Sequence, residues 1–165
     1  MPALRPMSDL EFSTWLAQAV PAYAADKVAS GQWAADTALD LSKKEHEQLL
    51  PQGLLTADNY LYSIVDAVGS VVGMLWFAVQ TKFNARVAYV FDIDVWPDHQ
   101  RQGHGTRAFQ ALESEVQRLG LAGIALHVFG HNTGAQALYA KLGFQPTNIS
   151  LYKAVAAASG GDTGA

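Results

Sequence analysis

The sequence has 165 residues, half of them hydrophobic and 16% charged, with a formal net charge of −4. This length and composition predict one globular domain, and the mild negative charge argues against a general nucleic-acid-binding protein, which needs a basic surface. The chain has no cysteine, which excludes disulfides, cysteine-ligated zinc and a cysteine nucleophile. No apolar run reaches the roughly 18 residues of a membrane span, and the N-terminus lacks the layout of a secretory signal, so we expect a cytoplasmic protein.

The first fifty residues predict a short strand followed by helices. Ser8 and Glu11 match a capping box, in which the Ser8 hydroxyl accepts from the Glu11 backbone N–H while the Glu11 carboxylate accepts from the Ser8 N–H. We expect Pro21 to interrupt the helix that begins there, because proline removes a backbone donor and clashes with the preceding turn. The ranges expected are a strand over 3–7 and further helices over 22–30 and 34–50.

From residue 60 the pattern changes to runs of β-branched and aromatic residues, which are typical of strands, separated later by two helical stretches. Gly69 and Ser70 are placed to form a hairpin turn, and Gly120 and Gly143 to end the two helices. The fold class is therefore α/β, in a single domain over 1–153 with a tail over 154–165 whose composition predicts disorder. The ranges expected are strands over 60–66, 71–80, 87–95, 124–129 and 144–153, and helices over 105–119 and 135–142.

A glycine-containing loop between Val95 and Thr106 joins a strand to a helix. Gly103 and Gly105 allow the backbone to turn tightly and approach a ligand, and the start of the following helix presents unpaired N–H groups that favour an anion. Arg101 adds positive charge, so a pyrophosphate is the expected ligand. The competing interpretations are a helix start that merely uses glycines and a dinucleotide-binding fold. The latter expects an acidic residue about 20 positions further on, at the end of the next strand, which has none.

The second chemical signal is a helix face near the C-terminus. Asn132, Ala135 and Tyr139 are spaced at i, i+3 and i+7, so they share one face and can direct an amide and a phenol at one ligand. The alternative is a buried helix in which Asn132 is only the N-cap and Tyr139 belongs to the core.

The two segments resemble the two conserved blocks of the GNAT superfamily of N-acetyltransferases. In this chain, the residues that resemble the first block are Gln100-Arg101-x-Gly103-x-Gly105. Those that resemble the second block are Asn132-x-x-Ala135-x-x-Leu138-Tyr139-x-Lys141-Leu142-Gly143-Phe144. They occur in the family's order and cover about 87–145. The resemblance implies a mixed, mostly antiparallel sheet with flanking helices, in which two central parallel strands, here 87–95 and 124–129, splay apart.

The resemblance also implies acetyl-CoA as the co-substrate and a division of roles. Tyr139 matches the acid that protonates the departing thiolate. His127 stands where ribosomal-protein N-terminal acetyltransferases have a glutamate, so the role of base could pass to its imidazole or be lost. The residues expected to bind acetyl-CoA are Ile93, Asp94, Val95, Arg101, Gln102, Gly103, His104, Gly105, Thr106 and Asn132.

Two carboxylates on the central strand are candidates for binding the acceptor. Asp92 and Asp94 face the same side, because side chains alternate along a strand, and an acidic cleft would attract a cationic amine. The alternative is that they pair with Arg86, Lys82 or a neighbouring loop. The N-terminal helices usually wall the acceptor site in this superfamily, so further candidates on that side are Trp33, Tyr23 and Glu11. The charged stretch 43–47 predicts a solvated helix face.

The function predicted from the sequence is transfer of an acetyl group from acetyl-CoA to a primary amine of a small molecule or a protein. The alternative is a non-catalytic acyl-CoA-binding sensor of the same fold. We expect no metal, because the five histidines include no HExxH pattern. We expect no nucleic-acid or membrane partner. Homodimers are common in the superfamily, but no segment of the sequence specifies an interface.

Overall fold

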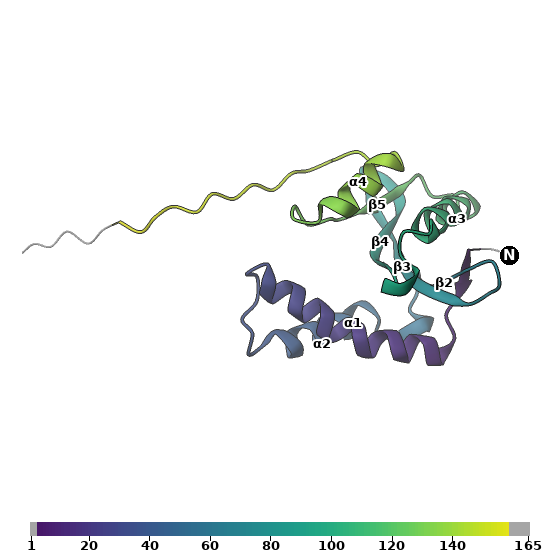
Figure 1. Ribbon diagram of the computed structural model, residues 1–165, viewed down its shortest axis with the longest axis horizontal. Coiled ribbons are helices and arrows are strands. Elements are labelled where there is room, and N and C mark those ends of the chain that lie inside the picture. Colours follow the sequence, from purple (N-terminus) through teal and green to yellow (C-terminus); the bar gives the residue numbers. More distant parts are fainter. Residues whose placement is uncertain (1–2, 159–165) are drawn as a thin grey trace, which may run out of the picture. The chain divides into compact units, whose positions relative to one another are not determined.

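Five strands form one mixed sheet in the order β1-β2-β3-β4-β5 (Figure 1). All neighbours pair antiparallel except β4 and β5, which pair in parallel. This computed structural model describes residues 3–158 and contains two compact units, Met1–His127 and Val128–Ala165, with the whole sheet in the first. The strands are β1 (Leu4–Pro6), β2 (Asn59–Val65), β3 (Val71–Lys82), β4 (Ala85–Val95) and β5 (Ile124–Leu126).

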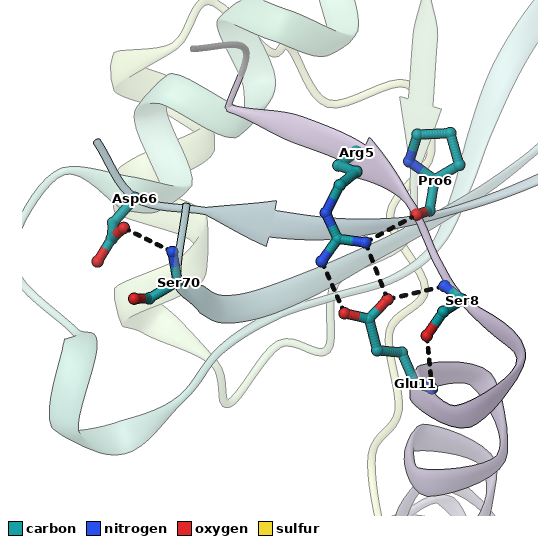
Figure 2. A network of polar contacts seen from close by, with 6 residues as sticks. All are labelled: Arg5, Pro6, Ser8, Glu11, Asp66 and Ser70. Atoms are coloured by element: carbon teal, nitrogen blue, oxygen red, sulfur yellow. Dashed lines mark hydrogen bonds and ion pairs between the residues drawn. The ribbon is translucent and has the colours of Figure 1, made fainter. Parts of the chain in front are cut away.

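The first helix, α1 (Asp9–Ala29), begins at the predicted capping box. Ser8 Oγ accepts from the Glu11 N–H at 3.2 Å, and Glu11 Oε2 accepts from the Ser8 N–H at 2.7 Å. Figure 2 shows that Arg5 of β1 binds the same carboxylate through both of its terminal nitrogens, at 3.1 and 2.7 Å. The start of α1 is thereby tied to the edge strand of the sheet.

The prediction that Pro21 interrupts this helix is wrong, because α1 continues through Pro21 as one element. A proline costs a helix interior about 3 kcal/mol. Packing of α1 against α2 (Ala38–Leu49) offsets this cost, and Ser42 Oγ of α2 donates to the carbonyl of Val20 at 2.6 Å, next to the proline. Tertiary contacts therefore outweigh the local preference.

The helix α2 begins at Ala38, four residues later than predicted. Ala38, Ser42, His46 and Leu50 are buried, at a spacing of four residues that forms one face of the helix. The prediction that 43–47 is a solvated face is therefore wrong at His46, whose side chain is only 9% exposed.

The core of the first unit lies on the long strands. Phe77, Leu75 and Val72 of β3 are fully buried, and β3 pairs with β2 through a hairpin in which Asp66 Oδ1 accepts from the Ser70 N–H at 2.9 Å (Figure 2). The helix α3 (His104–Arg118) contacts β1, β2 and β4. Its buried residues recur at helical spacing, as the sequence predicted: Ala108, Phe109, Leu112 and Val116.

The second unit contains α4 (Thr133–Lys141), which ends near Gly143, a residue with a left-handed backbone (φ 93°). The strand predicted over 144–153 is wrong for these described residues, which have no regular structure and expose Leu151 and Tyr152 almost completely. A strand needs a hydrogen-bonded neighbour, and the described part of this unit contains no other strand. Of the predicted tail, residues 154–158 are exposed and irregular, and 159–165 lie outside the described residues. Among residues 3–158, no helix is long and apolar enough to cross a membrane.

Candidate functional site

The strand β4 continues well beyond the end of its pairing with β5. Parallel pairing begins at Ala88 with Ile124 and ends at Val90 with Leu126, whereas β4 continues to Val95. The register between β3 and β4 shifts at this point, because Trp76 pairs with Asp92 and Phe77 with Val90. Phe91 is therefore the extra residue of a β-bulge, which bends and twists its strand. Within the first unit, the second half of β4 pairs with β3 on one side only. The two neighbouring parallel strands expected from the sequence are thus present, but β5 ends at Leu126, where its pairing with β4 also ends.

The open edge of β4 carries unused backbone groups. The N–H of Trp96 donates to the carbonyl of Val72 at 2.8 Å, and in an antiparallel pair only alternate residues exchange such bonds with the partner strand. Asp94 and Asp92 lie at every second position before Trp96 along the strand, so their backbone groups also face β3. The backbone groups of the residues between them, Ile93 and Val95, point away from β3. The carbonyl of Val95 accepts from Gln100 Nε2 at 2.9 Å. The remaining groups of this edge can pair with an extended ligand, as an added strand would.

The loop after β4 leads to a helix start without a side-chain cap. Arg101 and Gly103 have left-handed backbones (φ 61° and 82°), and α3 begins at the next residue, His104, without a side-chain cap. By contrast, Ser8 caps α1 and Asn132 caps α4, while α2 also begins without a side-chain cap. The N–H groups at the start of α3 therefore remain available to an anion, together with the positive end of the helix dipole. These groups belong to His104, Gly105 and Thr106.

The structure adds Arg107 to this loop, a residue that the sequence prediction missed. Its Nη2 donates to the carbonyl of Gln102 and to Nδ1 of the buried His104, both at 3.0 Å. A guanidinium can only donate, so Nδ1 of His104 is the acceptor and Nε2 carries the proton of the neutral ring. A helical side chain leans toward the N-terminus, and Arg107 stands one turn after Gly103. The four-residue spacing between Gly103 and Arg107 is the feature of the sequence that could have indicated this contact.

Asp92 and Asp94 face one side of β4, as predicted, opposite Trp76 and Met74 of β3. Asp92 accepts from Trp15 Nε1 of α1 at 3.4 Å, and burial raises the pKa of its carboxyl from 3.8 to about 6. Burial also raises the pKa of Asp94, which is nearer to solvent. The alternative that they pair with Arg86 or Lys82 is wrong: between described residues the ion pairs are Arg5–Glu11 and Arg118–Glu115. An unpaired carboxylate in such surroundings marks a candidate functional site.

The three acceptor-side candidates from the N-terminal helices have different environments. Tyr23 and Trp33 are half-buried and pack edge to face, with ring centroids 5.5 Å apart. Glu11 is bonded to Arg5 and Ser8 instead (Figure 2), and mainly the Arg5 hydrogen bonds lower the pKa of its carboxyl to about 2. The capping box therefore accounts for Glu11 without a substrate.

The remaining candidates lie at or beyond the end of the first unit. His127 is exposed and follows β5 directly, because the strand ends at Leu126 rather than at Phe129 as predicted. In the second unit, Asn132 caps α4 by accepting from the Ala135 N–H at 3.2 Å, which leaves its amide nitrogen as a donor. Tyr139 is half-buried on α4. Residues 3–158 contain no cluster of three histidine, aspartate or glutamate side chains that could hold a metal ion.

Comparison with known proteins agrees with this geometry. The model of the acetyltransferase (GNAT) family matches residues 25–144. The chain belongs to the GNAT family. The uncharacterized N-acetyltransferase YycN of Bacillus subtilis (strain 168) is 33% identical to this GNAT chain over 150 residues, covering 91% of this chain and 96% of YycN. The crystal structure of YycN superimposes with a TM-score of 0.86 at 32% identity, covering 93% of this chain and 98% of that one.

Two further similarities are more local or concern the fold alone. The [ribosomal protein bS18]-alanine N-acetyltransferase of Escherichia coli (strain K12) is 42% identical over 62 residues, which cover 38% of this chain and 42% of that enzyme. AAC(6')-Iy, solved in complex with the bisubstrate analog CoA-S-monomethyl-acetylneamine, has a TM-score of 0.61 at 16% identity and covers 93% of this chain and 97% of its own. GNAT proteins use acetyl-CoA, and the open β4 edge followed by the uncapped start of α3 fits that co-substrate.

Proposed function

We propose that this GNAT protein transfers an acetyl group from acetyl-CoA to a primary amine. The observation that carries the proposal is the succession of two features along the chain. The unpaired edge of β4 ends at Val95, and the uncapped helix start at His104 follows within nine residues. Acetyl-CoA has a thioester on an extended amide-containing arm and a diphosphate at the other end of that arm. The β4 edge suits the arm, and the helix start suits the diphosphate.

The proposed contacts rest on these two features for residues of the first unit, and on the resemblance to the family for Asn132. Backbone groups of Ile93 and Val95 pair with the arm, Asp94 lies beside them, and the amide nitrogen of Asn132 donates to an arm carbonyl. Arg107 adds positive charge to the loop. The residues proposed to hold the diphosphate are Arg101, Gln102, Gly103, His104, Gly105 and Thr106.

The reaction requires a neutral amine, an acid for the leaving group and a donor for the carbonyl oxygen. The ammonium form of the acceptor first loses a proton, for which we propose the imidazole of His127 as the base, because histidine accepts protons near neutral pH. The amine nitrogen then forms a bond to the acetyl carbon while the bond from that carbon to sulfur breaks. The N–H of Val95 donates to the acetyl oxygen as it gains negative charge. Tyr139 donates its phenolic proton to the departing sulfur, and the product amide nitrogen releases its second proton to solvent.

The relatives leave the acceptor open, because their names include a ribosomal-protein alanine and a neamine analog. The test is therefore release of the CoA thiol from acetyl-CoA by the full chain with a panel of primary amines. We expect Tyr139→Phe to lower kcat about 10²-fold or more, as for loss of a general acid, while the Kd for acetyl-CoA measured by calorimetry stays unchanged. Tyr152→Phe removes the same hydroxyl from an exposed residue of the same unit and serves as the control. Binding of acetyl-CoA without thiol release for any amine would establish the sensor alternative instead.

A further inference from the structure

Six aromatic side chains from α1, α2, β3, β4 and the loop after α1 form a continuous chain of ring contacts in the first unit. Ring centroids are 4.6 Å apart for Trp76 and Phe91, 5.6 Å for Trp15 and Trp76, and 5.6 Å for Tyr23 and His46. We call this group the aromatic cluster; its members are Trp15, Tyr23, Trp33, His46, Trp76 and Phe91.

The aromatic cluster extends from the core to the surface. Trp15 and Trp76 are 6% and 3% exposed, whereas Tyr23, Trp33 and Phe91 are half-buried. A cluster that served only the core would be expected to close at both ends. This one keeps flat ring surfaces within reach of solvent, which a small molecule can contact.

Asp92 places a single carboxylate at the buried end of the cluster. Asp92 follows Phe91 on β4 and is paired with Trp76 on β3. Its carboxylate accepts a hydrogen bond from Trp15 Nε1 at 3.4 Å. Neither of the two ion pairs between described residues involves Asp92. A largely buried carboxylate without a counter-cation is costly, and one positive charge from a ligand would compensate it.

His46 adds a polar atom of known character beside the same rings. Its Nδ1 lies 2.9 Å from the carbonyl oxygen of Ser42, and a carbonyl can only accept, so Nδ1 carries a proton. In the neutral ring Nε2 is therefore an acceptor. Among residues 3–158 no buried side-chain nitrogen or oxygen lacks a hydrogen-bond partner, and Nδ1 accounts for the only hydrogen bond of His46. It follows that Nε2 is reached by solvent, and an ammonium group can replace that water.

The outer end of the cluster already holds a cation. Nζ of Lys27 lies 5.4 Å from the Tyr23 ring centroid and 5.5 Å from that of Trp33, so these rings attract positive charge. Lys27 would repel a second ammonium at that end, while Glu45 near the Tyr23 hydroxyl restores neutrality there. The cluster therefore offers one carboxylate outside both ion pairs of the described residues, that of Asp92, and the half-buried rings of Tyr23, Trp33 and Phe91.

We infer that the aromatic cluster with Asp92 and His46 is the acceptor site, and that the acceptor is a primary amine with one positive charge on an aromatic or similarly flat apolar body. The inference rests on the proposed acetyl transfer, since Asp92 lies on the part of β4 that has left β5, beside the edge proposed for the thioester arm. Asp92 binds the ammonium, and Nε2 of His46 accepts a hydrogen bond from it. The half-buried rings of Tyr23, Trp33 and Phe91 contact the apolar body.

The test compares thiol release with 2-phenylethylamine, tryptamine, spermidine and a peptide that begins with alanine. We expect kcat/KM for the two aromatic monoamines to exceed that for spermidine and the peptide about tenfold or more. Asp92→Asn should raise KM for 2-phenylethylamine about tenfold or more, since the ammonium loses its charge partner. Glu47→Gln removes one negative charge from the exposed face of α2, next to His46 in sequence, and should leave KM unchanged.

A second variant and a binding measurement keep the outcomes distinct. His46→Asn retains a donor for the Ser42 carbonyl but removes Nε2, so it should also raise KM, and it carries the test if Asp92→Asn does not fold. Titration of 2-phenylethylamine should quench tryptophan fluorescence, because Trp15, Trp33 and Trp76 belong to the cluster. Equal kcat/KM for all amines, with unchanged KM in both variants, would overturn the inference alone. If no amine releases thiol, the proposed acetyl transfer fails. Quenching of tryptophan fluorescence by 2-phenylethylamine that occurs in the unmodified chain but in neither variant would still support the amine site.

Discussion

Gly73 of β3 offers a single methyl group as a test of how β4 is positioned at the proposed thioester site. A Cβ atom at Gly73 would overlap the backbone oxygen of Asp94 and lie 3.0 Å from Cα of Val95. Ordinary carbon contacts are about 3.5–4 Å, so β4 would have to move by roughly 0.5–1 Å. The obstructing atoms are backbone atoms, which cannot rotate aside as a side chain can. We therefore expect Gly73→Ala to displace Asp94 and Val95, at the end of the strand edge that we propose to line the arm.

The size of the effect follows from this displacement. Overpacking costs about 1–3 kcal/mol, which for a chain of this size lowers Tm by roughly 3–10 °C. A misplacement near 1 Å can cost about 10²-fold in rate, so we expect kcat for thiol release to fall about 10- to 100-fold. Kinetics are measured well below the Tm of the variant, so that unfolding does not contribute. Gly123→Ala is the matched control, because its Cβ would meet no atom within 4 Å. Equal kcat and Tm for the two variants would refute the reasoning.

Three further predictions concern the helix cap, the loop and the buried carboxylate. Glu11→Gln should lower Tm at pH 7 but not near pH 2. The pKa of the Glu11 carboxyl is lowered to about 2, so the stabilisation from the ionised carboxylate is lost as pH falls from about 4.5 to 2. An altered KM for amines would instead place Glu11 at the substrate. Gly103→Ala should weaken CoA binding about tenfold in calorimetry, because Gly103 has a φ of 82° and the new Cβ would lie 3.0 Å from Arg107 Nη1. The control Gly134→Ala should leave CoA binding unchanged. Asp92→Asn should raise Tm at pH 8 but not at pH 4. The raised pKa means that ionised Asp92 destabilises the fold, by up to about 3 kcal/mol above pH 6 and by nothing below pH 4; a pH-independent change in Tm would contradict this.

Local chemistry in the sequence predicted much of the fold. The capping box at Ser8, the hairpin before Ser70 and the positive φ of Gly103, Gly120 and Gly143 depend on residues within a few positions of one another. The uninterrupted α1 could not be predicted in the same way. The cost of Pro21 is local, whereas the compensating contact with Ser42 comes from another helix. The prediction at Pro21 was wrong because the compensating contact comes from a residue distant in the sequence.

The same distinction applies to the candidate site. The glycine loop and the spacing of Asp92 and Asp94 were visible in the sequence, because they depend on neighbouring residues. His46 was not, because its burial depends on α1 and β3 packing against α2. Its only signal was the four-residue spacing of Ala38, Ser42, His46 and Leu50, within a charged stretch that obscured it. The roles proposed for Tyr139, Asn132 and His127 remain predictions.

One extra residue in β4 connects the two halves of the proposed mechanism. Side chains two apart on a regular strand share a face, so Asp92 would lie with Val90, on the face of Phe77. Because Phe91 is a bulge, Val90 pairs with Phe77 but Asp92 pairs with Trp76, on the opposite face. The bulge therefore turns Asp92 toward Trp15 and the aromatic cluster at the same point where β4 leaves β5. A regular strand that kept Phe91 paired with Trp76 would instead set Asp92 opposite Leu75, on the face of Phe77. The amine site and the thioester edge thus depend on the same local irregularity, which places the acceptor charge and the open backbone groups within a few residues of each other.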